Sequence, residues 1–150
     1  MKIILDSGPV GLVTNPKRSV EARSCEEWLE SLSYTSHEIV LPEIIDYEIR
    51  RELIRARKRI GLESLDRLKK NATFLPIDSD TLLKAAEFWA DAHWRGIPTA
   101  HEASLDIDVI LAAQTWMYQT EGEVAIIATL NKKHLAQFVP AEHWKDIHLV

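Results

Sequence analysis

Large aliphatic residues cluster in short runs along the chain, and each run stops at polar or turn-forming residues. The clearest runs lie at 3–5 and 124–128, and the first is followed at once by Ser7, Gly8 and Pro9. Runs of this kind are typical of strands that are covered on both faces in a parallel sheet. Weaker strand candidates occupy 38–41, 73–77 and 147–150. The pattern predicts an α/β fold with a buried first strand.

Between these strand candidates, apolar residues recur with the period of an α-helix. The predicted helices cover 10–13, 20–32, 42–60, 62–70, 80–93 and 104–119, and Gly61 is expected to end the third of them. The fifth of them carries an apolar stripe formed by Leu82, Ala85, Ala86 and Trp89. We expect this stripe to pack on the core. The segment 95–103 reads as a loop just before a helix, which is a common place for functional residues.

Composition narrows the class of protein. A chain of 150 residues with 46% hydrophobic content is long enough for one domain with its own core, so we expect a single domain over 1–150. No apolar run is long enough to cross a membrane and the start shows no signal-peptide pattern, so we expect a cytoplasmic protein. The single cysteine, Cys25, shares a helical face with Trp28, Leu29 and Leu32. That spacing predicts a buried, unreactive thiol.

Charge is distributed unevenly along the chain. The net charge of −5 does not by itself indicate nucleic-acid binding, but the local field decides that property. The predicted helix at 42–60 is the most basic stretch, with Arg50, Arg51, Arg55, Arg57, Lys58 and Arg59. Ion pairs with Glu52 and Glu63 on a solvated face are the simplest account of most of these charges.

Several carboxylates occur at positions where a folded protein places few charges. Asp6 ends the first predicted strand, where ligand sites gather in α/β sheets, and it suits either a metal ligand or the N-cap of the next helix. Glu48 and Glu52 project beside the apolar stripe of their predicted helix instead of away from it. Glu48 is the stronger candidate because it lies nearer the start of that helix.

Two aspartates begin the late helix, and they point in roughly opposite directions. Asp108 opens an otherwise largely apolar stripe that continues through Leu111, Ala112 and Thr115. We therefore interpret Asp108 as a metal ligand first. Asp106 is interpreted first as an acid of the initial turn, favoured by the helix dipole, and only second as a ligand.

Polar residues also follow the last buried strand, where Thr129 and Asn131 come directly before Lys132 and Lys133. The Thr129 hydroxyl either hydrogen-bonds within the site or caps a strand end without a chemical role. Clustered carboxylates would repel a substrate that contains phosphate groups. Binding such a substrate therefore requires nearby cations. We expect Lys132 and Lys133 to bind the substrate, with the basic helix as the alternative.

The candidate catalytic set consists of Asp6, Glu48 and Asp108, joined by Asn131. Carboxylates brought together repel one another unless a hard divalent cation neutralises them, and oxygen ligands suit Mg²⁺ or Mn²⁺. Such a cluster predicts metal-assisted hydrolysis of a phosphodiester. The sequence has no Gly-rich phosphate loop, no Cys or His cluster at zinc spacing and no nucleophile elbow, which argues against those chemistries.

These residues resemble the motifs of PIN-domain nucleases, and most closely those of the small VapC-type toxins. The resemblance rests on the segments 4–7, 108–113 and 128–131, and on Pro42 followed six residues later by Glu48. It implies a Rossmann-like three-layer α/β/α sandwich with a central, mostly parallel sheet. It also implies an Mg²⁺- or Mn²⁺-dependent endoribonuclease that acts on RNA, with a small antitoxin protein as its partner, and a homodimer.

Carried over residue by residue, the resemblance implies that Asp6 and Asp108 hold the metal. Glu48 completes the acidic set and positions or deprotonates the attacking water. Asn131 takes a place where many members of the family have an aspartate, so the fourth ligand is weaker here or acts through water.

Four other classes share parts of this pattern. A phosphatase of the class that begins with a strand ending in aspartate expects a second aspartate at position 8, which is Gly8, and a receiver domain needs an acidic pair after its first strand. A PIN-fold housekeeping nuclease that processes RNA remains an alternative. So does a module that keeps the fold, has lost the metal and only binds nucleic acid or protein.

Overall fold

The structure, a computed structural model, describes residues 1–15, 17, 19–96 and 102–147. Its centre is a sheet of five parallel strands in the order β3-β2-β1-β4-β5. The strands are β1 (Lys2–Leu5), β2 (Glu38–Pro42), β3 (Thr73–Leu75), β4 (Ala125–Thr129) and β5 (Ala141–His143). The expected buried first strand is therefore confirmed as the middle strand of a parallel sheet.

Strand β1 is buried because it has a strand on each side and helices over both faces. Ile3, Ile4 and Leu5 expose no surface, and Ile4 lies in register between Val40 of β2 and Ile127 of β4. Because all five strands are parallel, their carboxyl ends meet at one edge of the sheet. Asp6 follows β1 directly and therefore stands at that edge.

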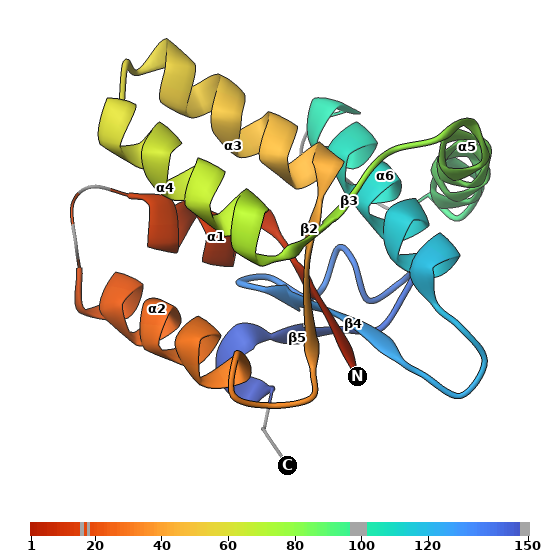
Figure 1. The fold of residues 1–150 in the computed structure, drawn as a ribbon. Coiled ribbons are helices and arrows are strands. Elements are labelled where there is room, and N and C mark those ends of the chain that lie inside the picture. The colour runs from red at the N-terminus through yellow and green to blue at the C-terminus, as the bar shows by residue number, and fades with distance from the viewer. Residues whose placement is uncertain (16, 18, 97–101, 148–150) are drawn as a thin grey trace.

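The helices form two layers around the sheet. They are α1 (Ser7–Thr14), α2 (Val20–Leu32), α3 (Glu43–Arg55), α4 (Arg59–Asn71), α5 (Ser79–Trp94) and α6 (Glu102–Tyr118), with a short 3-10 helix, η1 (Trp144–Asp146). Figure 1 shows α1 to α4 grouped together on one side and α5 with α6 on the other. This arrangement confirms the α/β sandwich. Along the described parts of the chain, no helix combines the length and apolar character that crossing a membrane requires.

The predicted helix at 42–60 is shorter than expected, because α3 ends at Arg55 and α4 already begins at Arg59. Arg57 between them adopts a left-handed conformation with φ of 54°. The backbone N–H of Arg57 donates to the Ile54 carbonyl at 3.0 Å, and that of Lys58 donates to the Leu53 carbonyl at 2.9 Å. These two bonds form a Schellman motif, which usually has glycine at this left-handed position.

Gly61 does not end a helix, as its type suggested, but lies inside α4. A Cβ atom at this position would come within 2.6 Å of the Leu53 side chain and 2.9 Å of the Thr14 carbonyl oxygen. The absence of a side chain therefore lets α4 pack closely on α1 and α3.

The interpretation of the α5 stripe as a core face is confirmed for Ala85 and wrong for Leu82, Ala86 and Trp89. Leu82 is 50% exposed and Trp89 is 38% exposed, whereas Ala85 and Ala92 are buried. The small alanine side chains pack α5 against α6, where Leu105, Val109 and Ala113 complete the contact. Leu82, Leu83, Trp89 and Trp94 are left on the surface, whereas Phe88 is partly buried and packs against the core.

Two other expectations fall partly outside the described residues. These are the loop at 95–103, of which 97–101 are not described, and the strand at 147–150, of which only Ile147 is described. The fifth strand of the sheet is β5 instead, and Ile147 directly follows η1.

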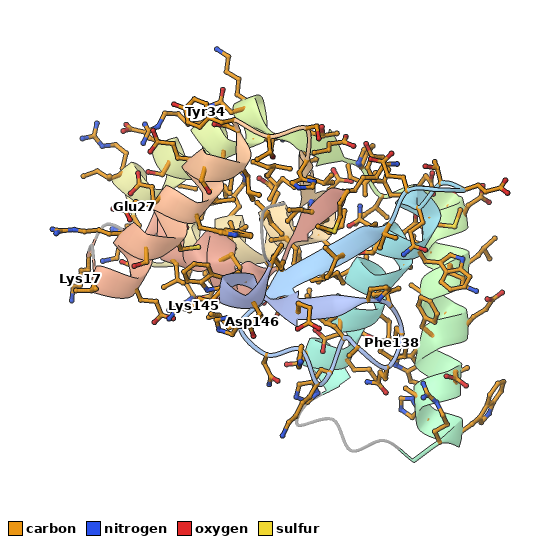
Figure 2. The ribbon with its side chains drawn as sticks, turned by 90° about the horizontal axis from the view of Figure 1, so that it is seen from below. Lys17, Glu27, Tyr34, Phe138, Lys145 and Asp146 are labelled. Atoms are coloured by element: carbon orange, nitrogen blue, oxygen red, sulfur yellow. The ribbon has the colours of Figure 1, made fainter. Side chains whose placement is uncertain are left out.

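Helix η1 packs against α2. The rings of Trp28 and Trp144 lie 5.6 Å apart, and Lys145 approaches Glu21 to 3.9 Å. Figure 2 shows Lys145 and Asp146 of η1 near α2. Cys25 is fully buried, and burial is the main reason that the pKa of its thiol rises to about 12. The prediction of a buried thiol is confirmed, and its raised pKa agrees with the expected low reactivity.

Candidate active site

Three of the predicted acids line one small cavity at the carboxyl edge of the sheet. The cavity has a volume of about 190 Å³, and its walls come from the residues after β1, from α3 and from α6. It is lined by Asp6, Ser7, Glu48, Arg51, Ser104, Ile107 and Asp108. The fold thus brings together carboxylates that are separated by up to 102 positions in the sequence, Asp6 and Asp108 being the outermost.

Asp6 is held in place by two short hydrogen bonds. Its Oδ1 accepts from the backbone N–H of Ser7 at 2.7 Å, and its Oδ2 accepts from the Thr129 hydroxyl at 2.7 Å. Asp6 therefore caps α1 and lines the cavity at once, so that the two interpretations of this residue are compatible. Burial raises the pKa of Asp6, and the hydrogen bonds from Thr129 and Ser7 oppose that rise.

Glu48 carries a carboxylate oxygen that has no partner. Within the described residues, Oε2 of Glu48 is buried and neither donates nor accepts a hydrogen bond. Burial raises the pKa of Glu48, the charges of Asp6 and Asp108 raise it further, and Arg51 opposes them. A buried oxygen without a partner is costly, so this position favours a proton or a cation in the cavity.

Asp108 reaches the same cavity from α6. Burial, together with the charge of Asp6, raises its pKa to about 7. Asp106 points elsewhere and lines a hollow between α5 and α6 that also contains Trp89. Glu52 is exposed and pairs with Arg55 at 2.8 Å. The structure therefore separates Asp108 from Asp106 as helical spacing suggested. It also separates Glu48 from Glu52, although spacing had placed both of these acids beside the apolar stripe.

Asn131 stands apart from the cavity lining. Its side chain is exposed, and Oδ1 accepts from the backbone N–H of Lys133 at 3.3 Å. Its own backbone N–H donates to the Thr129 hydroxyl at 3.1 Å. Since that hydroxyl donates to Asp6, Asn131 is connected to the acidic cavity through Thr129 and does not line it.

The two lysines after Asn131 have different surroundings. Lys132 approaches Glu142 of β5 to 3.3 Å and forms an exposed ion pair. Lys133 is also exposed, and in the described parts of the chain it has no ion pair. Neither lysine lines the acidic cavity.

Arg51 is the cavity residue that sequence reasoning did not single out. It lies three residues after Glu48, which places both side chains on neighbouring parts of one helix surface. The preceding residue, Arg50, is occupied elsewhere, because it binds Asp46 at 3.0 Å and Asp66 at 2.8 Å. The spacing from Glu48 was the available signal, but six basic residues crowd this stretch of sequence and obscure it.

The donor set of the cavity suits a hard divalent cation. Asp6, Glu48 and Asp108 offer only carboxylate oxygens, and Oε2 of Glu48 lacks a partner among the described residues. As the described side chains lie, no group of three or more His, Cys, Asp or Glu residues is arranged to hold one ion. Mg²⁺ is commonly bound through one or two carboxylates while it keeps several of its waters. The residues present therefore fit such an ion.

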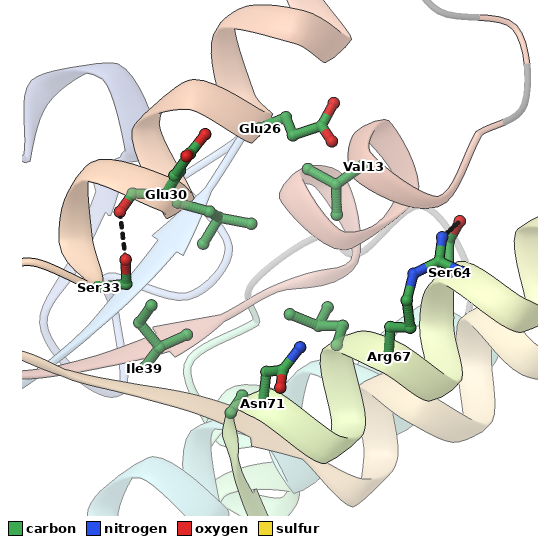
Figure 3. Close-up of a pocket in the computed structure, with 11 residues that line it drawn as sticks. Val13, Glu26, Glu30, Ser33, Ile39, Ser64, Arg67 and Asn71 are labelled. Atoms are coloured by element: carbon green, nitrogen blue, oxygen red, sulfur yellow. Dashed lines mark hydrogen bonds between the residues drawn. The ribbon is translucent and has the colours of Figure 1, made fainter.

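A larger hollow, of about 380 Å³, lies between α2 and α4 and has a different character. Figure 3 shows Glu26 and Glu30 of α2, with Ser33 directly after this helix, on one side and Arg67 and Asn71 of α4 on the other. Its charges are mixed and its lining includes Val13 and Ile39, so it does not gather carboxylates as the smaller cavity does.

No protein-family model matches the sequence, and no curated protein matches it. Solved structures do match. The fold is similar to a chain of VapBC2 from Rickettsia felis, solved with a DNA fragment from the promoter, with a TM-score of 0.72, 17% identity and coverage of 96% of this chain and 99% of that one.

Two further structures agree with the first. VapBC-1 from nontypeable Haemophilus influenzae gives a TM-score of 0.67 at 14% identity, covering 97% of this chain and 100% of that chain. DNA-bound VapBC from Salmonella typhimurium gives 0.64 at 14% identity, covering 96% and 98%. At these identities the likeness establishes the fold, and it bears out the fold class that the PIN-domain resemblance implied.

Proposed function

We propose that this chain, which shares its fold with components of VapBC complexes, is a PIN-type endoribonuclease that requires Mg²⁺ or Mn²⁺. One observation carries the proposal: three carboxylates from distant parts of the sequence line one cavity, and a buried oxygen of Glu48 has no partner there among the described residues. A fold that needed these acids only for stability would pair them or leave them in water.

The chain's own residues divide the work of phosphodiester hydrolysis. Asp6 and Asp108 are the proposed metal ligands, and Thr129 orients Asp6 through its hydrogen bond of 2.7 Å. Oε2 of Glu48, which accepts no hydrogen bond from the described residues, is the atom that takes a proton from the attacking water. A bound ion would supply the rest of the chemistry by activating that water and shielding the phosphate.

Roles can also be proposed for the residues after β4 that do not line the cavity. Asn131 is a proposed member of the catalytic set that acts through water or through Thr129, because its side chain does not line the cavity. Lys132 and Lys133 remain the proposed substrate-binding lysines at the end of β4. Lys133 is the stronger of the two, since Lys132 is paired with Glu142.

We also propose that the protein is the toxin of a toxin–antitoxin pair and that its partner is a small antitoxin. Support comes from the VapBC structures that share its fold over 96–97% of the chain. The homodimer implied by the resemblance would have the exposed apolar side chains of α5, including Leu82 and Trp89, available to bury.

The decisive experiment combines metal binding with cleavage. Calorimetric titration of the metal-free protein with Mn²⁺ should show binding that is lost in Asp108→Asn. Cleavage of labelled RNA should require Mn²⁺ or Mg²⁺, stop when EDTA is added, and be lost in the same variant. Asp106→Asn is the matched control, because Asp106 lies on the same helix and outside the cavity.

The alternatives predict different results in the same experiment. A module that has lost the metal would bind no Mn²⁺ at all. A properly folded Asp108→Asn variant that cleaves RNA at the parental rate would show that Asp108 is not a metal ligand. Cleavage without any antitoxin gene beside this one in the genome would favour a housekeeping nuclease.

A further inference from the structure

Arg51 lies at the border between the acidic cavity and a second hollow. That neighbouring hollow has a volume of about 520 Å³ and runs along the outer side of α3. Arg51 lines both spaces and is the residue that their linings share. Tyr47, Ile54 and Ile77 supply the aromatic and aliphatic lining of the second hollow.

Helix geometry explains why Arg51 joins the two spaces. Tyr47, Arg51 and Ile54 lie at positions i, i+4 and i+7 of α3 and so form one stripe on its surface. Glu48 lies three residues before Arg51 and faces the acidic cavity. At about 100° per residue, Arg51 falls between Tyr47 and Glu48 around the helix. The stripe therefore starts at the rim of the acidic cavity.

The stripe exposes apolar surface that core packing does not use. Tyr47 is 53% exposed and Ile54 is 59% exposed. The Arg51 guanidinium carbon lies 5.1 Å from the centre of the Tyr47 ring, in a cation–π contact that holds the arginine beside the ring. An exposed tyrosine next to a positioned arginine offers a surface for stacking and a charge for phosphate.

The charges around the hollow favour an anionic occupant on the Arg51 side. Asp46 is neutralised by Arg50, and Glu43 accepts a hydrogen bond from the backbone of Ile77 at 2.8 Å. Across the described ranges, Arg51 itself has no ion pair with a carboxylate. Beyond Ile54, the chain continues into Arg57 and Lys58. Cations therefore lie both beside the acidic cavity, at Arg51, and just after the end of α3, at Arg57 and Lys58.

From this geometry we infer a binding subsite for single-stranded RNA beside the acidic cavity, in which Tyr47 stacks on a base and Arg51 contacts a phosphate. The inference rests on the proposed nuclease function, since it places the nucleotide next to the one that is cut. Tyr47 and Arg51 are positioning residues that hold the strand and do not touch the reacting atoms.

Fluorescence anisotropy separates the two contributions. The probe is a labelled single-stranded RNA pool of randomised sequence, about 12 nucleotides long, within the range of site sizes for such proteins. All variants carry Asp108→Asn so that the probe survives the measurement. Tyr47→Leu should weaken binding about tenfold and leave the salt slope unchanged. Arg51→Ala should reduce that slope by about 0.7, the share of one phosphate contact on a single strand.

Conservative variants test whether the ring of Tyr47 and the charge of Arg51 are the groups that matter, and variants in the α2 region serve as distant controls. Tyr47→Phe should bind like the parent because it keeps the ring, and Arg51→Lys should keep the salt slope because it keeps the charge. Tyr34→Leu and Arg23→Ala remove an exposed tyrosine and an exposed arginine of the α2 region, and both should leave RNA binding unchanged.

The outcomes distinguish this subsite from the nuclease itself. If the parent chain cleaves RNA while Tyr47→Leu and Arg51→Ala bind it like the parent, the subsite is wrong and the nuclease stands. If both variants weaken RNA binding but the parent never cleaves RNA with Mn²⁺, the subsite stands and the nuclease is wrong. Variants that lose only the binding of a protein partner would identify a protein interface and overturn the RNA subsite.

Discussion

Helix α3 carries two acid–arginine pairs that look alike in sequence and differ in structure. Asp46 and Arg50 form a bidentate ion pair with both contacts at 3.0 Å, and Arg50 also binds Asp66 at 2.8 Å. Glu48 and Arg51 share the wall of the acidic cavity, and neither forms an ion pair within the described residues. The first pair is complete within the protein. The second leaves a negative and a positive group for something else to bind.

This difference separates two kinds of charged side chain. Those of the first kind have an ion-pair partner within the protein, and those of the second kind have none along the described parts of the chain and are available to a ligand. Glu52, one turn after Glu48, belongs to the first kind because Arg55 binds it at 2.8 Å and lowers its pKa. Glu48 belongs to the second kind, because burial and the neighbouring acids raise its pKa. Whether a charged side chain has an ion-pair partner within the protein therefore indicates its role better than its residue type does.

Replacing the unsatisfied acids should have the largest effect. Glu48→Gln and Asp108→Asn should each lower the rate of RNA cleavage by on the order of 100- to 1,000-fold, because each removes a group that acts on water or metal. Glu52→Gln and Asp106→Asn, the paired or outward-facing neighbours, should cost far less. Rates are measured with labelled RNA in Mn²⁺ at equal protein concentration.

The controls in that series test the comparison directly. If Glu52→Gln costs as much activity as Glu48→Gln, pairing with Arg55 does not exclude a catalytic role. If Asp106→Asn matches Asp108→Asn, the direction assigned to each side chain on α6 is wrong.

Replacing the satisfied acid should instead destabilise the fold. Asp46 is only 7% exposed, and Asp46→Asn would leave Arg50 partly buried with a weaker partner. We expect a loss of about 2 kcal/mol in the free energy of unfolding. Asp66→Asn is the control, because the Asp66 side chain is 64% exposed and its removal should cost less than about 1 kcal/mol. Urea denaturation measures both, and equal losses would contradict the distinction.

The sequence predicted four of the five strands of the sheet and several helices because local pattern and tertiary role agree there, but it did not predict β5. The apolar run at 3–5 is buried on both faces, and the helix at 20–32 has the bounds that its periodicity indicated. The break after Arg55 was missed because an arginine, Arg57, takes the left-handed position that glycine usually marks. Gly61 was misread because close packing, and not a helix end, explains it.

For the site, spacing along the late helix separated Asp108 from Asp106, and the structure agrees because Asp108 lines the cavity and Asp106 lines another hollow. Spacing placed both Glu48 and Glu52 beside the apolar stripe of their helix, and Glu48 was favoured by its position near the helix start and by the motif that it matches. In the structure Glu48 lines the cavity, whereas Glu52 is exposed and pairs with Arg55. Spacing did not reveal Arg51 as a cavity residue or the exposure of Trp89. Both depend on how α3 and α5 meet other helices, and a local pattern contains no information about that packing.

The free energy of unfolding should depend on pH because the buried acids that lack ion-pair partners among the described residues are unfavourable in their charged form. The pKa of Asp108 is about 7 in the folded protein against 3.8 in the unfolded chain. Between these values the folded state keeps a proton that the unfolded state loses, so the free energy of unfolding falls as pH rises through this window. Allowing for solvent screening of a half-buried group, we expect a fall of about 1–2 kcal/mol from Asp108.

Thermal melting in EDTA across that pH window tests this expectation. Asp108→Asn should show a smaller fall than the parent, with Asp6 and Glu48 contributing what remains because their pKa values are also raised. The variant should melt above the parent at the upper end of the window. Parallel pH profiles for the two proteins would show that Asp108 is not strained in the folded state.

The smallest effect is expected for the two lysines at the end of β4, where a paired and an unpaired charge can again be compared. Lys132 is paired with Glu142 at 3.3 Å, whereas Lys133 has no ion pair among the residues that the structure describes. If unsatisfied charges serve the ligand, Lys133→Ala should lower the salt slope of RNA binding by about 0.7, and Lys132→Ala should change it less. Each variant removes one positive charge, so the long-range field changes equally in both. Equal slopes in the two variants would therefore assign the lysines to that field and not to contact with phosphate.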